Sequence, residues 1–170
     1  MSKDGLQFSV GDHVVYPAHG VGQVQGLARK EVAGYSLEVY VLTFDLETMT
    51  VRVPTAKAKV SGLRSLAEGN VVSQALTTLK GRARVKRTMW SRRAQEYEAK
   101  INSGDLISIA EVVRDLHRAE NQPEQSYSER QLYESALDRM AREVAAIERI
   151  DREAAIGILT KSLTKAAVSA

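Results

Sequence analysis

Residues 8–22 read FSVGDHVVYPAHGVG, and this stretch decides the fold of the first part of the chain. Its β-branched and aromatic residues occur in short runs that Gly11-Asp12 and residues 17–20 separate. Gly, Asp and Pro favour tight turns, whereas Val, Tyr and Phe favour strands. The stretch therefore predicts short strands that follow one another through tight turns.

The same pattern continues to about residue 65. The predicted strands are Phe8–Val10, His13–Tyr16, Gly22–Val24, Leu37–Phe44, Met49–Val53 and Val60–Leu63, with further turns at Ala33-Gly34 and Asp45–Glu47. Five or six short strands at this spacing indicate a small barrel, because a closed sheet leaves no exposed edge.

After Leu66 the hydrophobic residues recur with a helical period, and in this part only Pro123 interrupts the pattern. The predicted helices cover 68–80, 82–102, 108–118, 126–149 and 152–165. Capping boxes at Ser108 and Ser126 open the helices 108–118 and 126–149, and Asp151 caps the helix 152–165. The sequence thus predicts an α+β protein of two modules. A β-barrel domain covers 1–66, an all-α bundle of four to five helices covers 67–166, and a frayed tail covers 167–170.

The composition, with 44% hydrophobic and 26% charged residues among 170, is that of a globular protein. The chain has no cysteine, which excludes disulfides and thiolate chemistry and fits a reducing compartment. No stretch approaches the roughly 20 apolar residues that a membrane span needs. We expect a cytoplasmic protein without a membrane partner.

Motifs of catalysis are absent from the sequence. There is no Gly-rich phosphate loop ending in Lys-Ser or Lys-Thr and no Gly-x-Ser-x-Gly. His13 and His19 lie across a turn with no third ligand nearby, and His117 is distant, so zinc binding is the poorer interpretation. A histidine packed on Tyr16 or Pro17 explains the turn better. We expect no enzyme, no metal and no cofactor.

A basic run covers residues 80–93. It holds seven cations and no acid, namely Lys80, Arg82, Arg84, Lys86, Arg87, Arg92 and Arg93. A solvated helix face explains most short cationic runs. Unopposed cations repel one another, however, and an ordinary exposed helix mixes both signs. Phosphate groups of a nucleic acid would relieve that repulsion.

Trp90 is the only tryptophan and lies inside the basic run. It begins a series with Ala94, Tyr97 and Ile101 at spacings of four, three and four, which predicts a buried helix stripe. The alternative is an apolar wedge that projects among arginines, as in proteins that unstack a base step from the minor groove. The pattern alone favours the buried stripe.

Several blocks, in this order along the chain, resemble one known family. They are residues 8–22, the strand Met49–Pro54, Trp90–Arg93, Ser103–Asp105 and Ala110–Leu116. They are similar to the CarD/CdnL family of bacterial transcription regulators that bind RNA polymerase. The resemblance covers the chain to about Leu163. It implies a Tudor-like (SH3-like) barrel that binds the polymerase β subunit and a helical domain that binds promoter DNA, with no enzymatic activity.

The resemblance also implies roles for particular residues. Trp90 matches the tryptophan that the family places in the minor groove at the upstream edge of the transcription bubble, which stabilises the open promoter complex. Arg92 and Arg93 match the basic residues beside this tryptophan, and Arg87 and Lys86 of the basic run are the other expected DNA contacts. The residues implied in polymerase binding are Arg52 and either Lys30 or Arg29. We expect a monomer that associates with the nucleoid through polymerase. The alternative is a polymerase-bound adaptor whose helical domain binds another protein.

Overall fold

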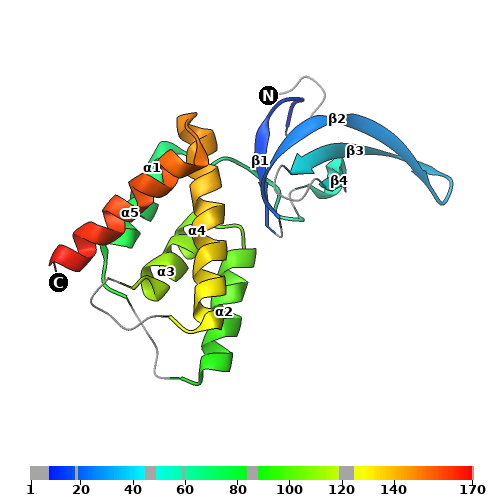
Figure 1. Cartoon of the computed structure of the whole chain (residues 1–170). Helices are drawn as coiled ribbons and strands as arrows, with labels where there is room; N and C mark the ends of the chain where they lie inside the picture. Colours follow the sequence, from blue (N-terminus) through cyan, green and yellow to red (C-terminus); the bar gives the residue numbers. More distant parts are fainter. Residues whose placement is uncertain are drawn as a thin grey trace. The chain divides into compact units, whose positions relative to one another are not determined.

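A computed structural model describes residues 8–17, 19–44, 49–58, 60–83, 88–118 and 125–169. The chain divides into two compact units, Met1–Leu66 and Ala67–Ala170 (Figure 1). The first unit contains the strands and the second the helices. Each unit has its own hydrophobic core.

The first unit is one antiparallel sheet in the order β4-β3-β2-β1-β5. Its strands are β1 (His13–Tyr16), β2 (Gly20–Val32), β3 (Tyr35–Phe44), β4 (Met49–Pro54) and β5 (Arg64–Ser65). A short 3-10 helix, Thr55–Lys57, follows β4. β5 returns to pair with β1, as in an SH3-like barrel, but among the described residues β4 and β5 remain edges of the sheet, so the expected closure without edges is not seen. The predicted fold class is confirmed.

Alternate residues of β3 form the centre of the barrel core. Tyr40, Leu42 and Phe44 are buried on one face of the strand, as its period of two requires. The Phe8 ring meets the Tyr40 ring edge to face at 5.6 Å, and the Phe8 N–H donates to the Tyr40 hydroxyl at 3.2 Å. Phe8 therefore belongs to the core as a single side chain, outside any strand.

Two of the predicted strands do not form. Residues 8–10 lead into a turn, because the Asp12 carboxylate accepts the Ser9 N–H at 2.9 Å and the Asp12 N–H donates to the Ser9 carbonyl. Around residues 60–63 the N–H of Ser61 donates to the Lys57 carbonyl and that of Leu63 to the Ala58 carbonyl, which is also a turn. Both segments are short enough for such local hydrogen bonds to decide their conformation.

Strand β2 is much longer than predicted and forms a hairpin with β3 that extends beyond the other strands (Figure 1). The hairpin turns at Ala33-Gly34, where φ is +52° and +82°, the left-handed values of a tight hairpin turn. In the distal part of β2 the side chains of residues 29–31 are all exposed. Without a buried face these residues have no alternating hydrophobic pattern, so the sequence did not indicate a strand there. The predicted turn at Asp45–Glu47 lies outside the described residues.

In the described residues of the second unit there are five helices. They are α1 (Gly69–Lys80), α2 (Trp90–Asn102), α3 (Leu106–Leu116), α4 (Tyr127–Glu148) and α5 (Arg152–Ser169). Helix α3 packs against α1, α2 and α4, and α5 packs against α1 and α4. Accordingly, Ile109, Ala110, Val112, Val113 and Leu116 of α3 are all buried. At the first residue of the second unit, the N–H of Ala67 donates to the buried Glu143 carboxylate of α4 at 2.8 Å.

Local hydrogen bonds confirm two of the three predicted caps. Ser126 accepts the N–H of Glu129, and Asp151 accepts the N–H of Ala154 at 2.7 Å. The third prediction, Ser108, is wrong, because Asp105 is the N-cap and its carboxylate binds both the N–H and the hydroxyl of Ser108.

The ends of two other helices differ from prediction. Helix α2 begins at Trp90, eight residues later than expected, and residues 84–87 lie outside the described part. Helix α5 continues to Ser169, into the segment expected to fray, since residues 166–169 contain no glycine or proline to end it.

Candidate functional site

Trp90 is the first residue of α2 and lies half-buried at the outer end of a buried stripe. Further along the stripe, Tyr97 and Ile101 are almost completely buried. The indole ring packs on Tyr97, with ring centroids 6.4 Å apart and planes tilted by 48°. The predicted stripe is therefore confirmed with Trp90 at its partly exposed end, whereas the wedge stays a prediction.

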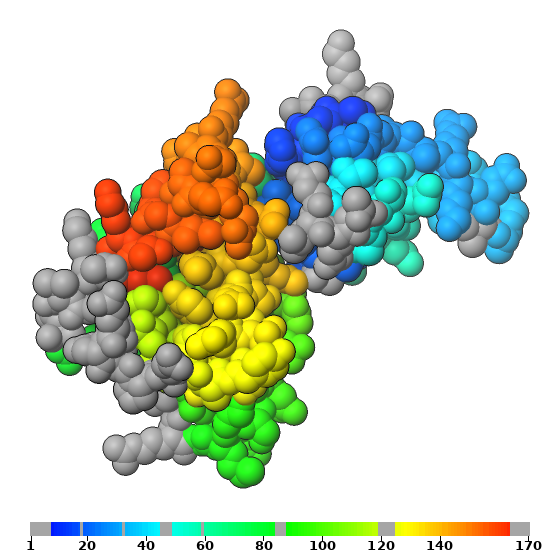
Figure 2. All heavy atoms as spheres, viewed as in Figure 1, coloured from blue at the N-terminus to red at the C-terminus, as the bar shows by residue number. Residues whose placement is uncertain are grey.

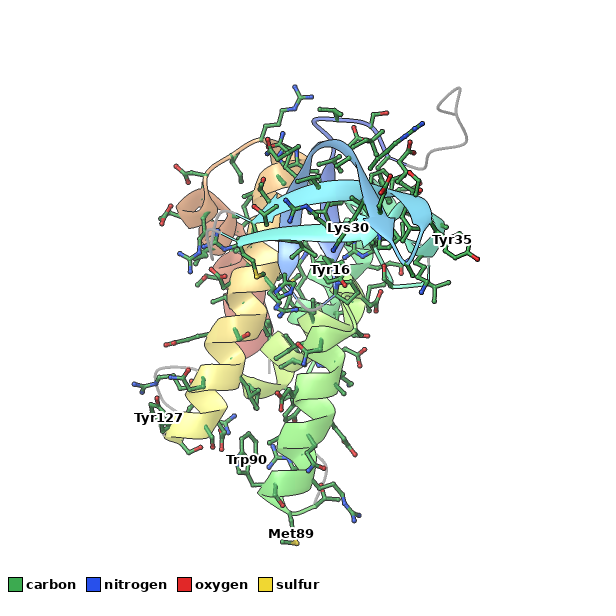
Figure 3. All side chains as sticks on the ribbon, turned by 90° about the vertical axis from the view of Figure 1, so that its right-hand side faces the viewer. Tyr16, Lys30, Tyr35, Met89, Trp90 and Tyr127 are labelled. Carbon is green, nitrogen blue, oxygen red and sulfur yellow. The ribbon has the colours of Figure 1, made fainter. Side chains whose placement is uncertain are left out.

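The first turn of α4 holds the indole from the other side. The Nε1–H of Trp90 donates to the Ser128 hydroxyl at 2.9 Å, across 38 residues of sequence. In the space-filling view of Figure 2, α4 in yellow borders α2 in green, and Figure 3 places Trp90 between the starts of these two helices. Sequence analysis did not find Ser128, because no periodicity relates residues on two different helices.

Arg93 lies one turn after Trp90 and covers both aromatic rings. Its guanidinium carbon is 5.3 Å from the Trp90 ring centroid and 5.9 Å from that of Tyr97. The side chain is half-buried, and its Nε is a buried atom without a hydrogen-bond partner among the described residues. A partly desolvated cation over an aromatic face is attractive. Arg93 therefore supports the indole in addition to carrying charge.

Arg92 and Met89 face outward at this end of the bundle. Arg92 is exposed, and the Met89 side chain is 78% exposed and projects from the start of α2 (Figure 3). They line an open groove together with Thr88, Ser91 and Gln95. The groove thus combines a cation and an apolar side chain at the start of α2, and Trp90 is not among the residues that line it.

The start of α2 is electrostatically suited to an anion. Its N-cap, Met89, makes no side-chain hydrogen bond, and the first turn of the helix has no acidic residue. The positive end of the helix dipole and the N–H groups of that turn therefore add to the charges of Arg92 and Arg93. Lys80 and Arg82 are exposed as well, whereas the predicted contacts Lys86 and Arg87 lie outside the described residues.

The register of the sheet separates the two candidate polymerase contacts on β2. Arg52 is exposed on β4, a strand at the edge of the sheet, and is paired with Val41, which is paired with Gly26. Paired residues share a face, and alternate residues along a strand return to it. Lys30, four residues after Gly26, therefore lies on the face of Arg52. Arg29 lies on the opposite face of the sheet.

His19 and His117 act as packing groups. His19 stacks on Tyr16, with ring centroids 5.6 Å apart and planes within 8°, as the interpretation of a packed histidine predicts. His117 Nδ1 lies 3.1 Å from the Tyr133 hydroxyl. Burial, and then the charge of Arg118, lower the pKa of His117 below 6.5. Across the described residues, no group of three or more His, Asp or Glu side chains could hold a metal ion.

The length and polarity of the helices were compared with those of a membrane-spanning helix. Within the described parts of the chain, every helix is too short or too polar to cross a bilayer.

Comparisons with known proteins match both units of the chain. The family model described as CarD, C-terminal domain, matches residues 74–160, and the model described as CarD-like/TRCF RID domain matches residues 8–67. YdeB of Bacillus subtilis (strain 168), provisionally named a transcription factor, is 28% identical over 143 residues, which are 84% of this chain and 94% of YdeB. The solution structure of the 72-residue N-terminal domain of Myxococcus xanthus CarD is 39% identical. The match covers 36% of this chain and 81% of the CarD domain, with a TM-score of 0.31. Because the two family models match in order and together span 8–67 and 74–160, the chain belongs to the CarD family of transcription regulators.

Proposed function

We propose that this protein regulates transcription initiation by binding the RNA polymerase β subunit through its barrel and stabilising the open promoter complex through its helical unit. In this proposal Trp90 enters the minor groove at the upstream edge of the transcription bubble. The observation that carries the proposal is the state of Trp90: a half-buried indole, held by Ser128 and Arg93, at the cationic end of α2.

The DNA contact follows from the chemistry of this surface. A large apolar ring that is flanked by cations can wedge into an unstacked base step while the cations neutralise phosphates. Arg92, which is exposed, is suited to phosphate, and Met89 adds apolar contact beside the ring. A wedge of this kind senses how easily a step unstacks and how wide the groove is, and it reads no full base code. Promoter selectivity should therefore follow the deformability of the DNA next to the bubble.

The polymerase contact is proposed for the face of the barrel that carries Arg52 and Lys30. Two exposed cations on one face of the sheet match a patch of carboxylates on a partner. Arg52 can bind a carboxylate through two parallel hydrogen bonds, whereas Lys30 supplies a point charge. Strand β4 is also an edge strand, so its backbone is accessible to a partner. Arg29 is not part of this surface.

The test is the lifetime of the open complex at a ribosomal-type promoter, with and without the protein. We expect the wild-type chain to lengthen this lifetime and the Trp90→Ala variant to bind polymerase without lengthening it. Circular dichroism checks that the variant is folded. If the folded Trp90→Ala variant lengthens the lifetime as much as the wild-type chain does, the wedge is contradicted.

Footprinting tests the alternative adaptor. Protection of DNA just upstream of the bubble, lost in Trp90→Ala, supports the proposed contact. Binding to polymerase without any such protection would mean that the helical unit binds a protein surface instead.

A further inference from the structure

We infer that Ser128 is a positioning residue for Trp90: its hydroxyl fixes the orientation in which α2 presents the indole to DNA. The inference rests on the proposed function, since the orientation matters only if Trp90 contacts DNA. It means that α4, a helix that the sequence did not connect with the site, contributes a residue that orients Trp90.

The geometry assigns this role to a single hydrogen bond. The indole N–H is only a donor, and it lies 2.9 Å from the Ser128 oxygen. Arg93 covers a ring face from one turn further along α2, and Tyr97 packs on the ring from two turns along. Both contacts come from the helix that carries Trp90 itself. Among the described contacts, Ser128 is the one that fixes the N–H edge of the ring from outside α2.

The orientation of the ring matters for a wedge because only one setting of the indole projects its free edge between base pairs. A tryptophan side chain has two rotatable bonds. The apparent affinity for DNA falls in proportion to the fraction of molecules whose indole is in the orientation that can bind. A typical hydrogen bond favours the bonded arrangement by a factor of about two to ten. Loss of the Ser128 hydroxyl should therefore weaken the action of Trp90 by a factor in that range and leave the barrel unaffected.

The chain offers a matched control and a specific probe. Ser126 is the same residue type two positions earlier, and it caps α4 by accepting the Glu129 N–H at 3.3 Å. Its removal weakens the helix start in the same turn without removing the bond to Trp90. Because Trp90 is the only tryptophan, intrinsic fluorescence of the full chain reports on this side chain.

The experiment compares full-length Ser128→Ala, Ser128→Thr and Ser126→Ala with wild type in two measurements. The first is acrylamide quenching of Trp90 fluorescence, and the second is the lifetime of the open complex with RNA polymerase holoenzyme. For Ser128→Ala we expect a higher quenching constant and about a two- to tenfold loss of the added lifetime. Ser128→Thr keeps the hydroxyl and should stay near wild type in both. Ser126→Ala should quench like wild type.

Each other outcome is decisive. Wild-type quenching in Ser128→Ala, or equal quenching in Ser126→Ala and Ser128→Ala, overturns the role of the hydroxyl. Higher quenching with an unchanged lifetime, while Trp90→Ala shortens that lifetime, also overturns the positioning role but leaves the proposed function intact. If Trp90→Ala itself leaves the lifetime unchanged, the proposed function fails and this inference fails with it.

Discussion

Reversing the charge of Lys30 should weaken polymerase binding far more than reversing that of its neighbour Arg29. The two residues are adjacent and exposed, and each substitution by Glu lowers the net charge from +3 to +1. They differ in the face of the sheet, because only Lys30 shares that of Arg52. The pair of variants therefore separates the position of a charge from its amount.

The magnitude follows from Coulomb's law. A carboxylate about 4 Å from another carboxylate at a protein surface is repelled by about 1–4 kcal/mol, according to the effective dielectric constant. Lys30→Glu should accordingly raise the Kd by roughly 5- to 700-fold. The Arg29 side chain points away from the contact, and charges more than about 8 Å apart are largely screened at physiological salt. Arg29→Glu should change the Kd by less than about twofold.

The assay is equilibrium binding of full-length variants to the purified polymerase β subunit, with Arg52→Glu as the positive control. Since Arg29 is paired with Glu38, Arg29→Glu places two acids opposite each other, and Arg29→Ala controls for this repulsion. Thermal unfolding checks that all variants remain folded. If Arg29→Glu and Arg29→Ala weaken binding as much as Lys30→Glu does, the assignment of the contact to one face is refuted.

Three further predictions concern stability. Asp105→Ala should lower the free energy of unfolding by about 1 kcal/mol, because α3 loses its N-cap, and Ser108→Ala should lower it by less. Equal losses for the two variants in urea denaturation would contradict the assignment of the cap to Asp105. Gly22→Ala should cost about 1–3 kcal/mol, since its methyl group would lie 2.6 Å from the Phe44 ring, and a wild-type Tm would disprove this overlap. His117 has a lowered pKa in the folded state, so the unfolded state binds its proton more readily and stability should fall as the pH drops below about 6.5. The fall in urea midpoint between pH 7.5 and 5.5 should be smaller in His117→Gln, and an equal fall rules out this residue as its source.

The sequence predicted those features that depend on neighbouring residues. Ser126 and Asp151 were identified as caps because a cap bonds to an N–H group three residues away. The change from a period of two to a helical period after Leu66 gave the order of strands and helices. Ser108 was wrongly chosen because Asp105, three residues earlier, competes for the same role and has the stronger acceptor.

The sequence could not predict features that arise between distant residues. The distal part of β2 is stabilised by pairing with β3 and has no buried face, so hydrophobicity carries no signal there. The bond from Trp90 to Ser128 depends on how α2 meets α4. The choice between Lys30 and Arg29 needed the register and the bulge between Val24 and Gly26, which shifts every later residue of β2 relative to β3.

The hydrogen bond between Ala67 and Glu143 has a consequence for how the two proposed binding activities would combine. Ser65 belongs to the last strand of the barrel, and Ala67 is already fixed to the helical unit, so Leu66 is the only residue between them. One residue spans at most about 3.6 Å. A junction this short gives little reach but a high effective concentration, of the order of millimolar for short linkers. If the barrel binds polymerase as proposed, a DNA contact too weak to be detected on free DNA would be well populated at the promoter.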